Sequence, residues 1–154
     1  MTPAIDAVRR AKVDHRVIEY DSDVEHGYGE EAATALGVPP DRVFKTLVAK
    51  LDGKQLVVAL VPVQTMLSLK SLAALADAKH AEMATPQEAE RATGYRVGGI
   101  SPLGQRRSLR TFADDSIMAL ERVYVSAGRR GLELELLPAD LVGLTDARLG
   151  RIAS

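Results

Sequence analysis

The sequence predicts a single domain of mixed α/β structure, and three observations carry this prediction. First, 154 residues of which 46% are hydrophobic and 27% charged can bury one ordinary core. Second, an Asp-Gly pair between two apolar runs predicts a β-hairpin, and a capping box farther along predicts a helix. Third, strands occur in several places and do not alternate with helices as regular βαβ units, so we expect one mixed α/β domain, residues 1–154.

The first forty residues predict two helices with a strand between them. Thr2 and Pro3 fit the N-cap and the first position of a helix, and Gly37 fits the residue that ends one. The predicted elements are a helix to about residue 13, a strand at 16–20, a loop at 21–29 and a short helix at 30–36.

The clearest local signal is the hairpin. The runs 44–51 and 55–63 flank Asp52-Gly53, the dipeptide preferred in type I′ turns. Both runs are rich in Val and Leu, so we expect them in the middle of the sheet.

The second half predicts further elements around an irregular loop. Leu69 to Ala78 is apolar at helical spacing, and Thr85 to Glu88 is a capping box that starts a helix ending near Gly94. Residues 95–107 have no periodicity and carry four Gly or Pro within seven positions. Strands are expected at 122–126 and 132–136, and one or two short helices at 138–149.

Composition excludes several classes of function. The chain has no Cys, which excludes disulfides and a protein thiol nucleophile, and its 4% aromatic content argues against a binder that stacks many bases. The N-terminus lacks a signal-peptide pattern and no apolar run could span a bilayer, so we expect a cytoplasmic protein without membrane contact. A net charge of −1 predicts only local RNA contact, for which two basic clusters, 106–110 and 129–130, compete with plain solvated surface.

Common catalytic motifs are absent. His15, His26 and His80 lack metal-ligand spacing, and no nucleophile elbow, P-loop or dinucleotide fingerprint occurs, so we expect neither metal nor cofactor. The Gly128–Gly131 segment matches the GxxG loop of KH domains, but a tight turn between two strands is the favoured interpretation.

Two features point toward a site. The glycines of 98–104 let a backbone present N–H groups to an oxyanion, although a structural Ω-loop would explain them equally well. Lys45 interrupts an apolar strand, which indicates either a partner or ligand for its charge or a side chain that reaches solvent.

Three segments resemble the YbaK/EbsC family, deacylases related to the editing domain of prolyl-tRNA synthetases. They are Val43-Phe44-Lys45-Thr46-Leu47, the run 93–105 through Gly98-Gly99-Ile100-Ser101-Pro102-Leu103-Gly104-Gln105, and the run 124–133. The resemblance extends over nearly the whole chain. It implies a mixed β-sheet curled into a partial barrel with helices packed around it.

The resemblance also implies a reaction and a site. The reaction is trans-editing: hydrolysis of Cys-tRNA(Pro) at the acceptor end, with the substrate thiol attacking its own ester to release a cyclic thiolactone. The implied catalytic residues are Lys45, Gly98 and Gly99, and the implied substrate-binding residues are Tyr20, Tyr28, Thr46, Ile100, Ser101, Ser126 and Glu133. Glu133 departs from the Asp of close relatives, which moves its carboxyl by about 1 Å.

Alternatives remain at this level. The substrate could be alanine or another small amino acid on tRNA, or the chain could be a non-catalytic adaptor for tRNA or prolyl-tRNA synthetase. Retention of Lys45 and of the full glycine loop favours catalysis. A monomer is expected, with prolyl-tRNA synthetase as a possible source of tRNA selectivity.

Overall fold

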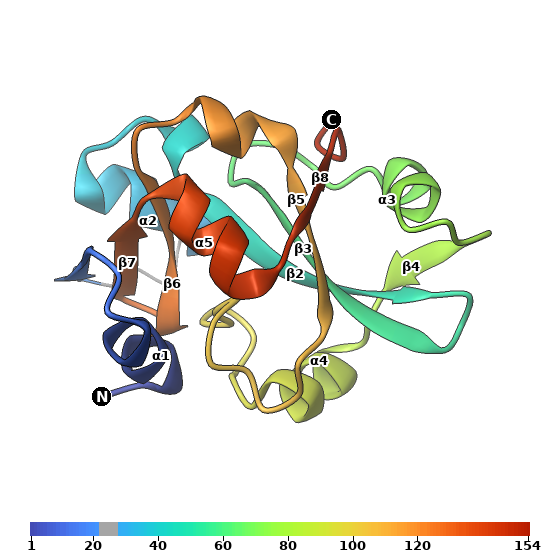
Figure 1. The fold of residues 1–154 in the computed structure, drawn as a ribbon, viewed down its shortest axis with the longest axis horizontal. Helices are drawn as coiled ribbons and strands as arrows, with labels where there is room; N and C mark the ends of the chain where they lie inside the picture. Colours follow the sequence, from blue (N-terminus) through green and yellow to red (C-terminus); the bar gives the residue numbers. More distant parts are fainter. Residues whose placement is uncertain (22–27) are drawn as a thin grey trace.

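The computed structural model describes residues 1–21 and 28–154, with only the backbone described at 28 and 29. Its strands form two hydrogen-bonded sheets (Figure 1). The three-stranded sheet has the order β1 (His15–Glu19), β7 (Leu132–Leu136) and β6 (Val123–Arg129). The five-stranded sheet has the order β4 (Ala81–Met83), β2 (Phe44–Leu51), β3 (Gln55–Pro62), β5 (Arg110–Asp114) and β8 (Arg148–Gly150).

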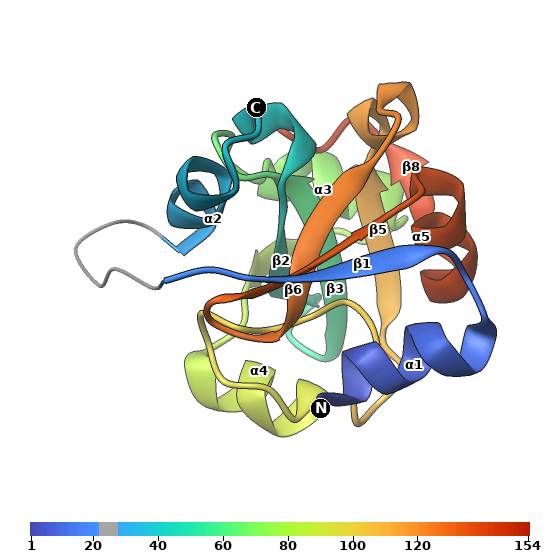
Figure 2. The same ribbon diagram turned by 90° about the vertical axis from the view of Figure 1, so that its left-hand side faces the viewer.

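The strands together make the expected mixed, curled arrangement. β3 pairs with β5, and β5 with β8, in parallel, whereas the remaining ladders are antiparallel. A single bridge between Val43 and Tyr124 joins the two sheets, and β1 runs across the other strands in the view of Figure 2. The barrel is therefore partial, as expected.

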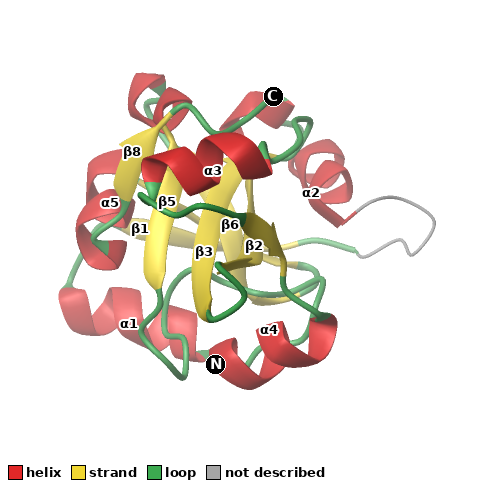
Figure 3. Cartoon of the chain, turned by 90° about the vertical axis from the view of Figure 1, so that its right-hand side faces the viewer, coloured by secondary structure: helices red, strands yellow, loops and turns green. Residues whose placement is uncertain are grey.

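Helices surround the strands, as Figure 3 shows. They are α1 (Pro3–Ala11), α2 (Tyr28–Leu36), α3 (Leu69–Leu75), α4 (Pro86–Thr93) and α5 (Pro138–Thr145), with 3₁₀ turns η1 (Pro40–Arg42) and η2 (Asp115–Ala119). Local signals fix several ends: Thr2 accepts a bond from the Ile5 N–H, and Thr85 and Glu88 form the predicted capping box. None of the described helices is long and apolar enough to cross a membrane.

The predicted hairpin is confirmed as β2–β3. Asp52 and Gly53 both have positive φ, 51° and 69°, as a type I′ turn requires. Both strands lie in the interior of the five-stranded sheet, as their apolar composition predicts.

Some elements differ from the prediction. The tail is only partly helical, because α5 ends at Thr145 and Arg148–Gly150 forms the edge strand β8. Strands β4 and β5 were not predicted, and α2 begins at Tyr28, two residues before its predicted start. β4 has only three residues, which are too few to show a period, so its pairing with β2 determines it.

Side chains along β7 alternate between the core and the opposite side of the sheet, where the site lies. Leu132, Leu134 and Leu136 enter the main core cluster, so Glu133 and Glu135 face the opposite side of the same strand. Tyr124 on β6 lies on this opposite side with Ala32 and Ala33 of α2. The side of the three-stranded sheet that faces α2 therefore carries two carboxyl groups, which a functional site on that side can use.

Strand β2 has one edge that is only half covered. All eight of its residues pair with β3, but β4 covers only Ala49 to Leu51 on the other edge. Val48 accepts a bond from the Ala84 N–H there, so even-numbered residues direct their backbone groups to this edge. Among the described residues, the edge at Phe44 and Thr46 has no strand partner, and a cavity opens beside it.

Candidate active site

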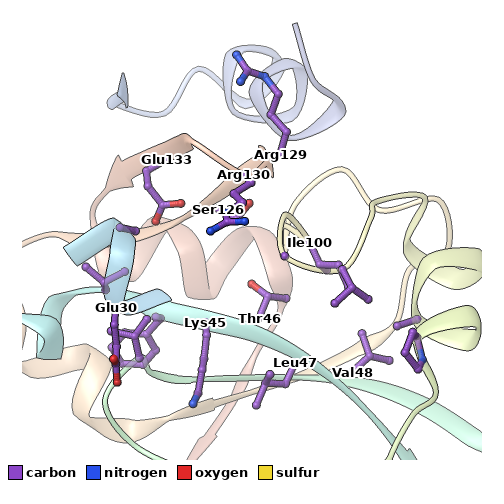
Figure 4. Close-up of a pocket in the computed structure, with 18 of the residues that line it drawn as sticks. Glu30, Lys45, Thr46, Leu47, Val48, Ile100, Ser126, Arg129, Arg130 and Glu133 are labelled. Atoms are coloured by element: carbon purple, nitrogen blue, oxygen red, sulfur yellow. The ribbon is translucent and has the colours of Figure 1, made fainter. Parts of the chain in front are cut away.

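A cavity of about 490 Å³ lies between the open edge of β2, the loop at 98–100 and the α2-facing side of the three-stranded sheet. Figure 4 shows its polar side chains. Its lining brings together seven of the residues expected from the sequence: Tyr20, Lys45, Thr46, Gly98, Ile100, Ser126 and Glu133. Gly99 and Ser101 are not among the described residues that line it, and the side chain of Tyr28 falls outside the described part of the chain.

Lys45 and Thr46 are neighbours in the chain but lie on opposite sides of β2, because side chains alternate along a strand. The Nζ of Lys45 donates to the carbonyl of Thr65 at 2.5 Å and points away from Ser126 (Figure 4). Burial lowers the pKa of Lys45, and the nearby Glu30 carboxylate opposes this shift. Of the two alternatives for Lys45, the structure shows a partner for its charge at the cavity wall.

Thr46 supplies an unsatisfied group. Its Oγ1 is buried and has no hydrogen-bond partner among the residues the structure describes. A buried hydroxyl without a partner costs free energy, so its persistence beside a cavity is typical of a group that a ligand satisfies.

The two glycines of the loop have different positions. Gly98 lines the cavity at φ +96°, and its N–H has no acceptor within the described chain. The Gly99 N–H already donates to the Arg96 carbonyl at 2.9 Å. A Cβ at Gly99 would lie 2.7 Å from the Cα of Arg129, so this glycine permits the loop to pack against the β6–β7 turn.

The two serines hold the loop in place. The hydroxyl of Ser126 donates to the Gly99 carbonyl at 3.0 Å and accepts from the Gly128 N–H at 3.1 Å. Ser101 is fully buried, and its Oγ accepts from the Leu103 N–H at 3.3 Å. Both hydroxyls are therefore engaged within the chain, and none of the histidines that the structure describes lines the cavity to activate them.

Glu133 is a buried acid that faces the cavity. It is 5% exposed and has neither a hydrogen bond nor an ion pair with any described group, whereas Glu135 two residues on accepts from the Tyr124 hydroxyl at 2.6 Å. Burial raises the pKa of Glu133 to about 8, so its carboxyl is protonated at neutral pH and can donate a hydrogen bond. Burial and the neighbouring Glu133 also raise the pKa of Tyr20, which keeps that phenol neutral.

The sequence did not predict an ion pair formed by the cavity residue Arg130. Arg130 in the β6–β7 turn donates to the buried Glu31 of α2 at 2.6 Å and so ties α2 to the turn. The partners are 99 residues apart, and no local pattern could have linked them. Arg130 belongs to a cluster considered for RNA contact, and its guanidinium lies in this pair.

Apolar residues of β4 and α4 complete the lining. Met83, Ala84, Pro86 and Ala89 face the cavity, and their sequence carried no signal beyond helix capping. The Gly128–Gly131 segment forms the turn between β6 and β7, which confirms a hairpin there. No three His, Cys, Asp or Glu residues within the described chain lie close enough together to bind a metal ion.

The fold is shared with known structures. The chain superimposes with a TM-score of 0.86 on the crystal structure of a candidate trans-editing enzyme for prolyl tRNA synthetase, covering 100% of this chain and 98% of that one. The identity is 23%, so this likeness establishes the fold alone.

Sequence comparison defines the family. Residues 26–144 match the model of the aminoacyl-tRNA editing domain, and the chain belongs to that family. It is 33% identical to EbsC of Enterococcus faecalis, named a candidate Cys-tRNA(Pro)/Cys-tRNA(Cys) deacylase, over 99% of this chain and 93% of that protein. It is also 40% identical over 88 residues to the proline–tRNA ligase of Nitratidesulfovibrio vulgaris, matching 57% of this chain but 15% of the ligase.

Proposed function

We propose that this protein deacylates Cys-tRNA(Pro) in trans, by cleaving the ester that joins a wrongly attached cysteine to the terminal ribose. Membership in the aminoacyl-tRNA editing family supports the deacylase reaction, and the similarity to EbsC supports cysteine as the amino acid. The observation that carries the mechanism is a cavity with unsatisfied polar groups and no activated nucleophile among its described residues.

In this mechanism the thiolate of the substrate cysteine attacks its own ester carbonyl. The C–S bond forms, the C–O bond to the ribose breaks, and the ribose oxygen takes up a proton as a cyclic thiolactone leaves. Effective concentration supplies much of the rate, and the protein must orient the ester and stabilise the developing oxyanion.

Each residue has a proposed role within this reaction. The free N–H of Gly98 donates to the oxyanion, and Gly99 supports its position. Thr46 and protonated Glu133 donate to the substrate, while Tyr20, Tyr28 and Ile100 shape the pocket.

Ser101 and Ser126 have a supporting role, because they hold the loop at 98–100 in place. Lys45 lies on the far side of β2, where its charge suits a phosphate or the ribose.

The proposal also includes how the tRNA is selected and where the protein acts. A prolyl-tRNA synthetase would select the tRNA, as the match to a proline–tRNA ligase suggests. The protein would act as a monomer in the cytoplasm, and it needs no cofactor for this chemistry.

The test measures deacylation of Cys-tRNA(Pro), Ala-tRNA(Pro) and Ser-tRNA(Pro) by the purified protein. We expect rapid loss of cysteine alone, abolished by Lys45→Ala and retained by Lys54→Ala, an exposed lysine at the turn of the same hairpin. Equal hydrolysis of the serine ester would exclude thiol participation. Loss of alanine instead would replace the substrate, and no hydrolysis of any ester would favour the adaptor.

A further inference from the structure

An arginine-rich surface lies beside the mouth of the cavity and has no role in the reaction described above. Residues 91–113 contain five arginines and no Asp or Glu, in a chain whose net charge is −1. All five, Arg91, Arg96, Arg106, Arg107 and Arg110, are exposed. Such a local excess of positive charge is not expected from the average composition.

The fold gathers four of these arginines around the end of α4. The Arg106 N–H donates to the Thr93 carbonyl and the Arg107 N–H to the Ala92 carbonyl, at 2.9 and 3.0 Å. The two segments therefore run side by side, which brings Arg106 and Arg107 next to the last turn of α4. The side chain of Arg106 also passes over Gly94, 3.5 Å from where a Cβ would stand. We call Arg91, Arg96, Arg106 and Arg107 the arginine surface.

These guanidinium groups form no ion pair with any described residue. Of the two acids of α4, Glu88 pairs with Lys50, whereas Glu90 lies near Arg96 and accepts a hydrogen bond from the Val97 N–H at 2.8 Å. The positive charge is thus available to a partner.

The surface is continuous with the cavity. Met83 and Val97 line the cavity and are 45% and 47% exposed, which places them at its mouth. Val97 follows Arg96 directly, and Ala89 of α4 lines the cavity two residues before Arg91. A polynucleotide whose terminal ribose enters the cavity past Met83 and Val97 would run beside the arginine surface.

We propose that the arginine surface binds the phosphodiester backbone of the acceptor stem while the aminoacyl end occupies the cavity. This inference rests on the proposed function. Phosphates are the groups that exposed guanidiniums bind best, and contacts of this kind fix the register of an RNA without reading its sequence. Limited, local binding also fits a chain whose net charge is −1.

The experiment compares two double variants with equal loss of charge. Arg106→Gln/Arg107→Gln removes two charges from the surface. Lys54→Gln/Arg151→Gln removes two exposed charges elsewhere, one of them in the C-terminal segment at the opposite end of the molecule from α4 (Figure 1). Thermal melts verify that both variants fold.

Two substrates, one with the acceptor stem and one without it, distinguish binding of the stem from an effect on the ester. On cysteinyl-tRNA we expect KM of the surface variant to rise roughly tenfold with kcat unchanged, as loss of two phosphate contacts implies. On a cysteinyl CCA trinucleotide, which lacks the stem, both variants should match the wild type. An unchanged KM on tRNA, or an equal rise on the trinucleotide, would overturn the proposal.

A direct measurement of RNA binding tests the arginine surface independently of catalysis. Fluorescence anisotropy with an uncharged acceptor-stem minihelix should show a weaker salt dependence for the surface variant, with the slope of log K against log salt reduced by about 2. Identical slopes in wild type and variant would refute the RNA contact and leave a protein partner for this surface. Failure of the proposed function would instead appear as no hydrolysis by the wild type, whatever the binding.

Discussion

The two hairpins of this protein have similar apolar strands but different turns. β2–β3 closes through the three residues 52–54 and keeps one register over its whole length. β6–β7 changes register between Ser126 and Arg129, and its turn carries the ion pair to α2 and the contact with Gly99. Both hairpins contribute to the core, but the irregular one also redirects its turn toward α2 and the loop at 98–100, because a bulge can redirect side chains that a regular ladder cannot.

The difference teaches that the two hairpins, although both help to form the core, contribute to the cavity in different ways. β2–β3 contributes to the cavity only through its open edge, where Lys45 and Thr46 lie. β6–β7 contributes Ser126 and Glu133, which are paired directly opposite each other on neighbouring strands. Substitutions in the two hairpins should therefore have different effects.

The largest expected effect concerns the ion pair of the β6–β7 turn. Arg130→Met should lower the free energy of unfolding by about 3 kcal/mol, since it leaves the buried Glu31 carboxylate without this partner. The matched variant Arg129→Met, whose partner Glu19 is exposed and 3.9 Å away, should lower it by less than about 1 kcal/mol. Urea denaturation measures both, and equal losses would contradict this assignment.

The pH dependence of stability tests Glu133. Its pKa is raised from 4.5 to about 8 in the folded protein, so the folded state holds the proton more tightly than the unfolded chain between these values. Stability should therefore fall as the pH rises through this window. Relative to Glu133→Gln, which cannot titrate, we expect the wild type to lose about 3 kcal/mol between pH 5 and pH 8.

The Glu133→Gln variant also tests whether activity requires the protonated or the charged form of this carboxyl. Gln retains an N–H donor, so Glu133→Gln should remain active and should not lose activity above pH 8 as the wild type does. A pH profile of kcat/KM measures this. An inactive variant with a normal melt would show that the charged form of Glu133 is required.

A matched pair of glycines compares the loop at 98–100, which packs against the β6–β7 turn, with the β2–β3 turn. Gly99→Ala should lower stability by about 2 kcal/mol and reduce kcat, because its Cβ meets the Arg129 backbone and displaces the neighbouring Gly98 N–H. Gly53→Ala has open space but a positive φ, so we expect a loss of about 1 kcal/mol without an effect on kcat. Similar kcat values for the two variants would contradict the role of the loop.

The smallest effect is expected at the open edge of β2. Thr46→Val removes a buried hydroxyl that has no partner among the described residues, and should raise stability by up to about 1 kcal/mol. If the hydroxyl binds substrate, KM should rise in the same variant. Loss of stability together with an unchanged KM would assign Thr46 to packing.

The sequence by itself determined the locally encoded parts. Asp52-Gly53 specified the hairpin turn because both residues tolerate positive φ, and Thr85 with Glu88 specified the start of α4 because their side chains bond their own backbone. The family resemblance indicated Lys45, Thr46 and Gly98, and the structure brings these residues to one cavity.

Only the tertiary structure decided the remaining features. It placed Lys45 and Thr46 on opposite sides of the β2 edge, engaged the Gly99 N–H within the loop, paired Arg130 with Glu31 and gathered the arginine surface around α4. β8 exists because β5 offers it a partner, not because three residues favour a strand. These features depend on contacts between residues far apart in the chain, and a local sequence pattern reports only the interactions of near neighbours.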